Sequence, residues 1–105
     1  MIYISHLLED EEMREVVAQT GAGVESIEFS VSDNLDSLED KISTYQKRMK
    51  MMGAERLTLH GPFLDMNPMS YDSRIREVTM ERFTQAYEAG IRLGAEKIVY
   101  HTCFL

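Results

Sequence analysis

Short apolar runs alternate with longer segments of helical periodicity along the whole chain. The short runs are rich in β-branched and aromatic residues and predict strands at about residues 1–5, 26–30, 56–60 and 97–101. Between them apolar residues recur three and four positions apart, which predicts helices at about residues 9–20, 35–52 and 72–93. Strands that alternate with helices, without hairpin signals, indicate one α/β domain over residues 1–105 with a parallel βαβαβαβ sheet.

The middle helix has the clearest apolar stripe, formed by Leu35, Leu38, Ile42, Tyr45, Met49 and Met52. Asp33 or Asn34 is the expected N-cap, and Gly53 is the expected stop. The same spacing also fits a coiled coil, but the stripe is short, so we favour a helix packed on a sheet. In the last helix the stripe is Ile75, Thr79, Phe83, Ala86, Gly90 and Leu93, with Asp72 or Ser73 as cap.

A segment that begins with glycine, continues as a predicted strand and ends in a polar residue occurs more than once. Residues 53–60 (GAERLTLH) match residues 94–101 (GAEKIVYH) position by position, 41 residues later, and residues 23–30 (GVESIEFS) form a weaker copy. Such repetition is typical of tandem βα units. In parallel α/β folds the residues at the carboxyl ends of the strands do the chemistry, so the polar tips are the first candidates for a site.

Composition and charge limit the classes of binding partner that we expect. The 105-residue chain is 44% hydrophobic and has a formal charge of −7, which opposes binding to nucleic acid and favours a small-molecule or protein partner. No run is long and apolar enough to span a membrane. The single cysteine, Cys103, excludes an internal disulfide, so we expect a cytoplasmic protein. Cys103 lies two residues from His101 and is either a nucleophile or, as is commoner, simply buried.

All three histidines, His6, His60 and His101, fall at the predicted carboxyl end of a strand. They either share one site or are three separate histidines that each bond to a loop. Side chains alternate along a strand, and the repeat aligns Ser30 with His60 and His101, so Glu28 is expected on the same face. A buried carboxylate there needs a metal, a cation or a polar ligand, unless the face is exposed. Two imidazoles and a carboxylate suit Zn²⁺ or Mn²⁺.

Three segments resemble one known family: residues 57–68 (LTLHGPFLDMNP), residues 75–77 (IRE) and residues 93–101 (LGAEKIVYH). They are similar to the xylose-isomerase-like (β/α)8 TIM barrels, which comprise sugar phosphate isomerases and epimerases, with endonuclease-IV-type enzymes as relatives. The resemblance covers nearly the whole chain and is most specific in the HGPF loop and in the strand that ends at His101.

The resemblance implies that the chain is the amino-terminal half of a barrel whose intact protein is a metal-dependent sugar or sugar-phosphate isomerase or epimerase. The catalytic carboxylates then lie on later strands, so the chain alone is expected to be inactive. His60 and His101 correspond to metal ligands in the endonuclease-like branch and to pocket-lining positions in many sugar isomerases. The expected cofactor is a divalent metal (Zn, Mn or Mg). The expected substrate-binding residues are His6, Glu28, His60, Phe63, Asp65 and His101, with residues 61–68 above the pocket.

Two other functions compete with this one. The first is a fragment of an endonuclease-IV-like DNA-repair enzyme, which the −7 charge disfavours. The second is a complete, small, non-catalytic α/β binding module. Because half a barrel leaves its first and fourth strands as unpaired edges, we also expect a homo-oligomer that forms through these edges.

Overall fold

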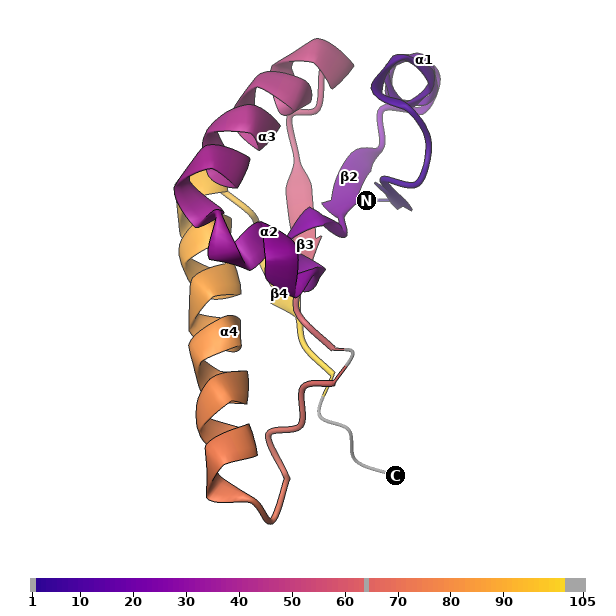
Figure 1. The fold of residues 1–105 in the computed structure, drawn as a ribbon. Helices are drawn as coiled ribbons and strands as arrows, with labels where there is room; N and C mark the ends of the chain where they lie inside the picture. Colours follow the sequence, from indigo (N-terminus) through magenta and orange to yellow (C-terminus); the bar gives the residue numbers. More distant parts are fainter. Residues whose placement is uncertain (1, 64, 102–105) are drawn as a thin grey trace.

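The computed structural model describes residues 2–63 and 65–101. Strands and helices alternate along it, as Figure 1 shows. In chain order the elements are β1 (Tyr3–Ser5), α1 (Asp10–Thr20), β2 (Gly23–Ser26), the 3₁₀ helix η1 (Glu28–Ser30), α2 (Ser32–Asp36), α3 (Leu38–Met52), β3 (Leu57–His60), α4 (Ser73–Leu93) and β4 (Lys97–Val99). The four strands form one sheet in the order β1-β2-β3-β4, and every pair is parallel. The α/β class and the parallel sheet are therefore confirmed.

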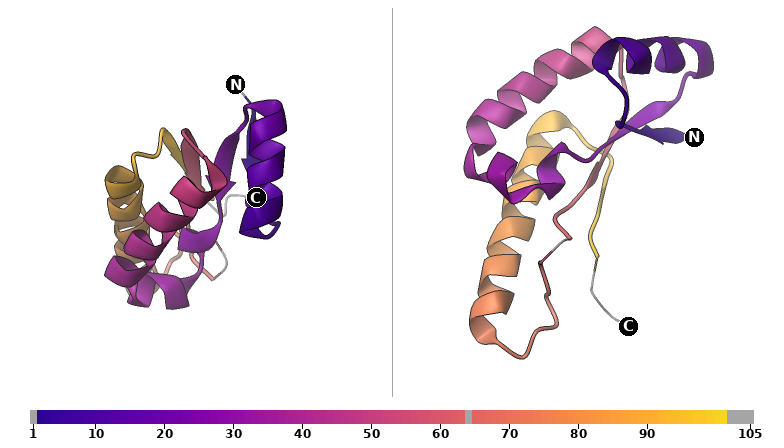
Figure 2. Two further views of the ribbon diagram at one scale, coloured as in Figure 1. Left: turned by 90° about the horizontal axis from the view of Figure 1, so that it is seen from above. Right: turned by 45° about the vertical axis from the view of Figure 1, so that its right-hand side comes forward.

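The helices form a layer on one face of the sheet. Successive strands are neighbours, so right-handed crossovers place every connecting helix on the same side. α1 packs against α3, and α3 packs against α4, so α1 and α4 stand at the two ends of the layer (Figure 2). The other face of the sheet has no helix of the described residues over it. There the paired residues Ser5, Glu25, Thr58 and Lys97 form one polar row across all four strands.

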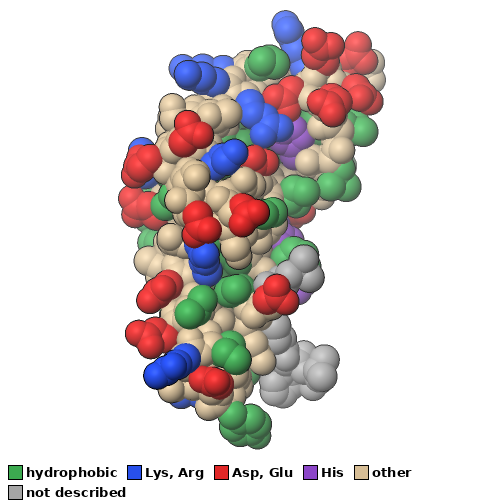
Figure 3. Space-filling view, viewed as in Figure 1, with side chains coloured by type: hydrophobic (Ala, Val, Ile, Leu, Met, Phe, Trp, Pro, Cys, Tyr) green, Lys and Arg blue, Asp and Glu red, His purple; other side chains and the backbone are tan. Residues whose placement is uncertain are grey.

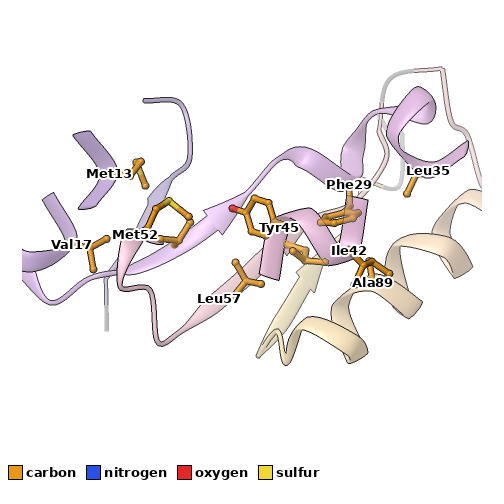
Figure 4. Packing of buried hydrophobic residues seen from close by; sticks show 11 residues of the cluster. Met13, Val17, Phe29, Leu35, Ile42, Tyr45, Met52, Leu57 and Ala89 are labelled. Atoms are coloured by element: carbon orange, nitrogen blue, oxygen red, sulfur yellow. The ribbon is translucent and has the colours of Figure 1, made fainter. Parts of the chain in front are cut away.

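The core lies between the sheet and the helices. Val24 and Leu57 are register partners on β2 and β3, and both are buried on the helix side. Ile42, Tyr45 and Met52 from the expected stripe of the middle helix pack onto them (Figure 4). Burial of an apolar side chain of this size contributes about 1.5–3 kcal/mol, so this stripe holds α3 in place.

The second strand lies three residues earlier than the sequence predicted. β2 spans Gly23–Ser26, and residues 28–30 form η1 instead of the strand expected over 26–30. Ser26 ends the strand, because its Oγ accepts the backbone N–H of Glu28 at 3.2 Å. The repeat predicts the later position because its first copy begins at Gly23. The left-handed residue that ends α1 is Gly21, with φ 67°, and it is equivalent to Gly53 and Gly94.

The middle helix is also interrupted, which the sequence did not predict. α2 begins at Ser32 after Val31, so neither Asp33 nor Asn34 is the cap, and Ser37 separates α2 from α3. The Asn34 amide instead donates to the Glu28 carbonyl at 2.8 Å and ties α2 to η1. At α4 the cap prediction is confirmed, because the Asp72 side chain accepts the Arg74 N–H.

The surface over the helices mixes acidic and basic side chains (Figure 3). In the described part of the chain no helix combines the length and the apolar character needed to cross a membrane. Cys103, the alternative nucleophile, lies outside the described residues.

Candidate functional site

Two of the three histidines meet at the carboxyl end of the sheet. His60 is the last residue of β3 and pairs in register with Val99 of β4. His101 follows two residues later, so alternation returns it to the face that His60 shares. The two Nε2 atoms lie 2.9 Å apart, and the rings are tilted by 43°. The register between β3 and β4 thus brings together two imidazoles that are 41 positions apart in the sequence.

The backbone fixes the protonation of the His60 ring. Its Nδ1 lies 2.9 Å from the Gly61 carbonyl oxygen, which can only accept, so Nδ1 carries the proton. In this tautomer the Nε2 lone pair of His60 faces His101. Metal-binding histidines have the same arrangement, in which the distal nitrogen donates to a carbonyl and the other nitrogen is free to coordinate.

Phe63 completes an aromatic cluster with these histidines. Its ring centroid lies 4.7 Å from that of His60, edge to face, and 4.9 Å from that of His101. These are the separations of stabilising aromatic pairs, so Phe63 limits the orientations of both imidazoles.

A hollow opens beside this cluster at the tips of β2 and β3. Its volume is about 400 Å³, and its lining combines apolar and polar side chains, namely Ile27, Ser30, Val31, Ser32, His60, Phe63 and Asp65. Asp65 has a φ of 62°, a left-handed conformation that is unusual outside glycine. The structure therefore places His60, Phe63 and Asp65 around one hollow, with His101 in contact with two of them. Their roles as substrate-binding residues stay predictions.

His6 is held elsewhere, in a buried polar network. Its Nδ1 lies 2.8 Å from the Tyr45 hydroxyl, and its Nε2 lies 2.9 Å from Asp10 Oδ1. The Asp10 carboxylate also accepts two hydrogen bonds from Arg48, both of 3.0 Å. Both ring nitrogens are satisfied, the residue is only 8% exposed, and it shares no described contact with His60 or His101, so the structure does not bring His6 to the histidine pair, and its role as a substrate-binding residue stays a prediction.

Charge and burial shift two pKa values in this network. The Arg48 hydrogen bonds lower the pKa of Asp10 below its ordinary value, so the carboxylate stays ionised. Burial raises the pKa of Tyr45 to about 12, which keeps the phenol protonated. We infer that Tyr45 donates to His6 Nδ1 and that His6 Nε2 donates to Asp10.

The strand alternation from which the sequence predicted the position of Glu28 does not apply in the structure. Glu28 lies on η1 rather than on a strand. Its carboxylate is 3.5 Å from Arg48, which supplies the cation that the sequence argument required. The sequence singled out Tyr45 only as a core residue of the middle helix, and it did not identify Arg48 or Asp10 as partners of His6. The only local signal was the four-residue spacing between His6 and Asp10, since Arg48 comes from 38 residues away.

The histidine pair gains no third ligand from the described residues. Among residues 2–63 and 65–101, no three side chains of His, Cys, Asp or Glu are placed to hold one metal ion. This part of the chain therefore offers two converging nitrogens but not a complete metal site.

An exposed cluster occupies the other end of the sheet. Arg56 donates two hydrogen bonds to Glu96, of 2.6 and 2.7 Å, and the Tyr3 hydroxyl donates a third of 2.7 Å. The Arg56 hydrogen bonds, followed by that of Tyr3, lower the pKa of Glu96 to about 2. The cluster links Arg56, just before β3, and Glu96, just before β4, to Tyr3 of β1, at the end of the sheet opposite to the histidines.

Comparison with known proteins places this fold within longer chains. No protein-family model matches the sequence. Over 75 residues, 71% of this chain, it is 28% identical to the uncharacterized protein MJ1311 of Methanocaldococcus jannaschii, of which it covers 26%. Its structure resembles that of the TTHB071 protein from Thermus thermophilus, soaked with ZnCl2, with a TM-score of 0.74 and 21% identity. That likeness covers 99% of this chain and 39% of the other, so the shared fold is part of a larger one.

Proposed function

We propose that this chain is the amino-terminal part of a metal-dependent isomerase or epimerase that acts on a sugar or sugar phosphate. The observation that carries the proposal is the 2.9 Å approach of His60 Nε2 and His101 Nε2 at the carboxyl end of a parallel sheet. In parallel α/β folds this end carries the chemistry. A hollow with apolar walls and a few polar groups, typical of small-molecule sites, lies beside the pair.

The donor set fits two positions of a divalent metal site. Two imidazole nitrogens bound to a tetrahedral Zn²⁺ at about 2.1 Å are about 3.4 Å apart, so the observed 2.9 Å separation would need to widen by about half an ångström to hold the ion. The bond from His60 Nδ1 to Gly61 holds the ring in the tautomer that coordination requires. His60 and His101 would hold the ion together with ligands from outside this chain. A bound divalent ion supplies Lewis acidity for the negative charge that develops on the substrate oxygen.

The hollow has groups suited to a carbohydrate. Ser30 and Asp65 provide hydroxyl and carboxylate oxygens for sugar hydroxyls, and the Phe63 ring provides an apolar surface. We assign these residues and His60 to binding and orientation of the substrate. Glu28 and His6 are left out, because Arg48 holds the first and the Tyr45–Asp10 network holds the second.

Among the described residues no carboxylate completes a three-residue metal-holding group with the histidine pair, and Asp65 is assigned to sugar hydroxyls, so we place the base that moves the proton in a later part of the protein. This agrees with the coverage of the longer chains, of which this sequence spans 26% and 39%. The −7 charge supports a small metabolite over nucleic acid, so we rank the DNA-repair alternative below the isomerase. We retain the cytoplasm as the proposed location.

The proposal is tested by saturation-transfer NMR of the chain with a panel of aldoses, ketoses and their phosphates. We expect contact between protein and sugar that weakens at least about tenfold in His60→Ala and Phe63→Ala, because each removes part of the lining. The control variant is Glu77→Gln on the outer side of α4, which should bind as the wild type does. Equal binding by all variants, or binding of none of the sugars, would refute the proposal.

The position of the base is tested in deuterated water with Mn²⁺ present. The chain alone should not exchange the proton beside the substrate carbonyl. Exchange catalysed by the pure chain would show that the base lies within residues 1–105.

A further inference from the structure

Gly61 follows His60 directly, and its backbone contacts both strands of the histidine pair. The Gly61 carbonyl oxygen accepts from His60 Nδ1 at 2.9 Å. The Gly61 N–H donates to the Val99 carbonyl at 2.8 Å, two residues before His101. Because the β3–β4 register pairs His60 with Val99, Gly61 stands opposite Tyr100. One residue therefore orients the ring of His60 and pairs with the strand that carries His101.

The backbone conformation does not explain why residue 61 is glycine, because its φ lies outside the left-handed region. The reason is space. A Cβ at residue 61 would lie 2.7 Å from Cδ1 and 2.9 Å from Cε1 of Tyr100, and 3.2 Å from the Val99 carbonyl oxygen. Separations below 3.0 Å are too short for a Cβ, so a side chain at residue 61 would have to displace the Tyr100 ring.

The Tyr100 ring is held in this position by α4. Its hydroxyl donates to the Phe83 carbonyl at 3.1 Å, and its ring centroid lies 4.5 Å from that of Phe83. Alternation along the strand places Tyr100 on the helix side and His101 on the opposite face. A ring that is fixed at its far end transmits a push to its own backbone. A side chain at residue 61 would therefore shift His101 relative to His60.

A similar contact occurs at the opposite end of the sheet. Tyr3 and Gly23 are register partners on β1 and β2. A Cβ at residue 23 would lie 2.5 and 2.6 Å from two carbons of the Tyr3 ring and 3.1 Å from the Arg56 carbonyl oxygen. An aromatic ring packed over a glycine of the neighbouring strand stabilises a sheet. Stability alone therefore accounts for Gly23, whereas Gly61 also touches His60 and stands opposite the residue before His101.

We propose that Gly61 is a positioning residue for the histidine pair. The space left by its missing side chain lets Tyr100 pack on α4 while His101 Nε2 reaches His60 Nε2 on the other face of the sheet. The inference rests on the proposed function for the importance of the pair, but its content is the geometry between two imidazoles. If Gly61 only stabilised the sheet, its replacement would lower stability without changing that geometry.

The test is ¹⁵N NMR of the whole chain labelled at histidine, at a mildly alkaline pH where neutral imidazoles dominate. Since His60 Nε2 has the lone pair, His101 Nε2 donates to it, and this bond gives a scalar coupling between the two nitrogens. We expect the coupling in the wild type and its loss in Gly61→Ala. Gly23→Ala is the matched control, because it creates the same kind of ring clash. It should lower stability and keep the coupling.

The Tyr100→Val background removes the two ring carbons that a Cβ at residue 61 would meet. There the coupling should be present with and without Gly61→Ala, which also decides the matter if Gly61→Ala alone does not fold. The proposal is overturned by a wild type without the coupling, by a folded Gly61→Ala that keeps it, by its loss in Gly23→Ala, or by its loss in the Tyr100→Val background. A coupling that behaves as expected in a chain that binds no sugar would refute the proposed function alone.

Discussion

His60 and His101 face each other through their Nε2 atoms at 2.9 Å, at the ends of adjacent parallel strands. The two residues are 41 positions apart in the sequence. Their contact depends on the β3–β4 register, which pairs His60 with Val99. A one-residue slip would turn one imidazole toward the helices. The packing that fixes this register is therefore as important to the site as the histidines themselves.

Gly90 lets α4 approach the sheet closely. A Cβ at residue 90 would lie 2.5 Å from Ile98 Cδ1 and 3.1 Å from its Cγ1. Alanine is otherwise favoured over glycine in a helix by about 1 kcal/mol, so without a clash Gly90→Ala would stabilise the protein. Destabilisation would therefore indicate a steric clash with Ile98. We expect Gly90→Ala to lower the free energy of unfolding by about 1–2 kcal/mol in urea denaturation.

The control for this prediction is the Ile98→Val background, which removes the Cδ1 methyl. There Gly90→Ala should be neutral or stabilising. Destabilisation of equal size in both backgrounds would mean that contact with Ile98 is not the reason for the glycine.

Tyr45 is expected to stabilise the fold through its hydroxyl as well as its ring. The ring is buried in the core and packs edge to face on Phe29, and the hydroxyl is 2.8 Å from His6 Nδ1. Tyr45→Phe keeps the ring and leaves the His6 nitrogen without its donor, which should cost about 1–3 kcal/mol. Thermal and urea unfolding measure the loss. Tyr71→Phe, at an exposed tyrosine, is the control, and a similar change in both variants would contradict the role of the His6 contact.

Asp10 should make stability depend on pH at the acid end. Arg48 lowers the pKa of Asp10 in the folded chain from the ordinary 3.8, so the unfolded chain binds the proton more readily. The contribution is complete above about pH 3.8 and disappears as the pH falls through the folded pKa. Asp10→Asn should lose about 1–2 kcal/mol at neutral pH and show a shallower decline below pH 4. If the free energy of unfolding fell equally steeply below pH 4 in the wild type and in the variant, this prediction would be contradicted.

The Glu96 carboxyl should titrate near pH 2, because Arg56 and then Tyr3 bind its charged form. Carbon-detected NMR of the side-chain carboxyl measures the midpoint directly. Arg56→Ala should return the pKa most of the way to the ordinary 4.5, and Tyr3→Phe should raise it by less. An unchanged midpoint in Arg56→Ala would show that the ion pair does not form in solution.

The sequence predicted most elements because local signals determine them. α1, β3 and α4 lie within one residue of their expected bounds, since amphipathic periodicity and glycine stops define helices without reference to the rest of the chain. β2 was misplaced because two glycines, Gly21 and Gly23, flank one alanine, and only the backbone shows which is left-handed. The break at Ser37 accompanies the contact of α2 with η1, which apolar periodicity does not indicate.

The histidine pair of the site was also predictable from local signals, but the surroundings of His6 were not. Alternation along strands was enough to bring His60 and His101 to one face, because His101 lies two positions after Val99, the register partner of His60. His6 looked equivalent at the level of sequence, but its partner Tyr45 comes from the middle helix, as does Arg48, which binds the Asp10 carboxylate beside it. Long-range partners of this kind leave no local pattern, so the sequence could not separate a structural histidine from the other two.

The most direct test is a Zn²⁺ titration of the whole chain followed through the histidine ring nitrogens by ¹H–¹⁵N NMR. We expect the Nε2 signals of His60 and His101 to shift together, the Nδ1–H of His60 to persist, and His6 to stay unchanged. His60→Ala should abolish the shift at His101. A shift confined to one histidine, or one that includes His6 equally, would contradict a convergent pair at the carboxyl end of the sheet.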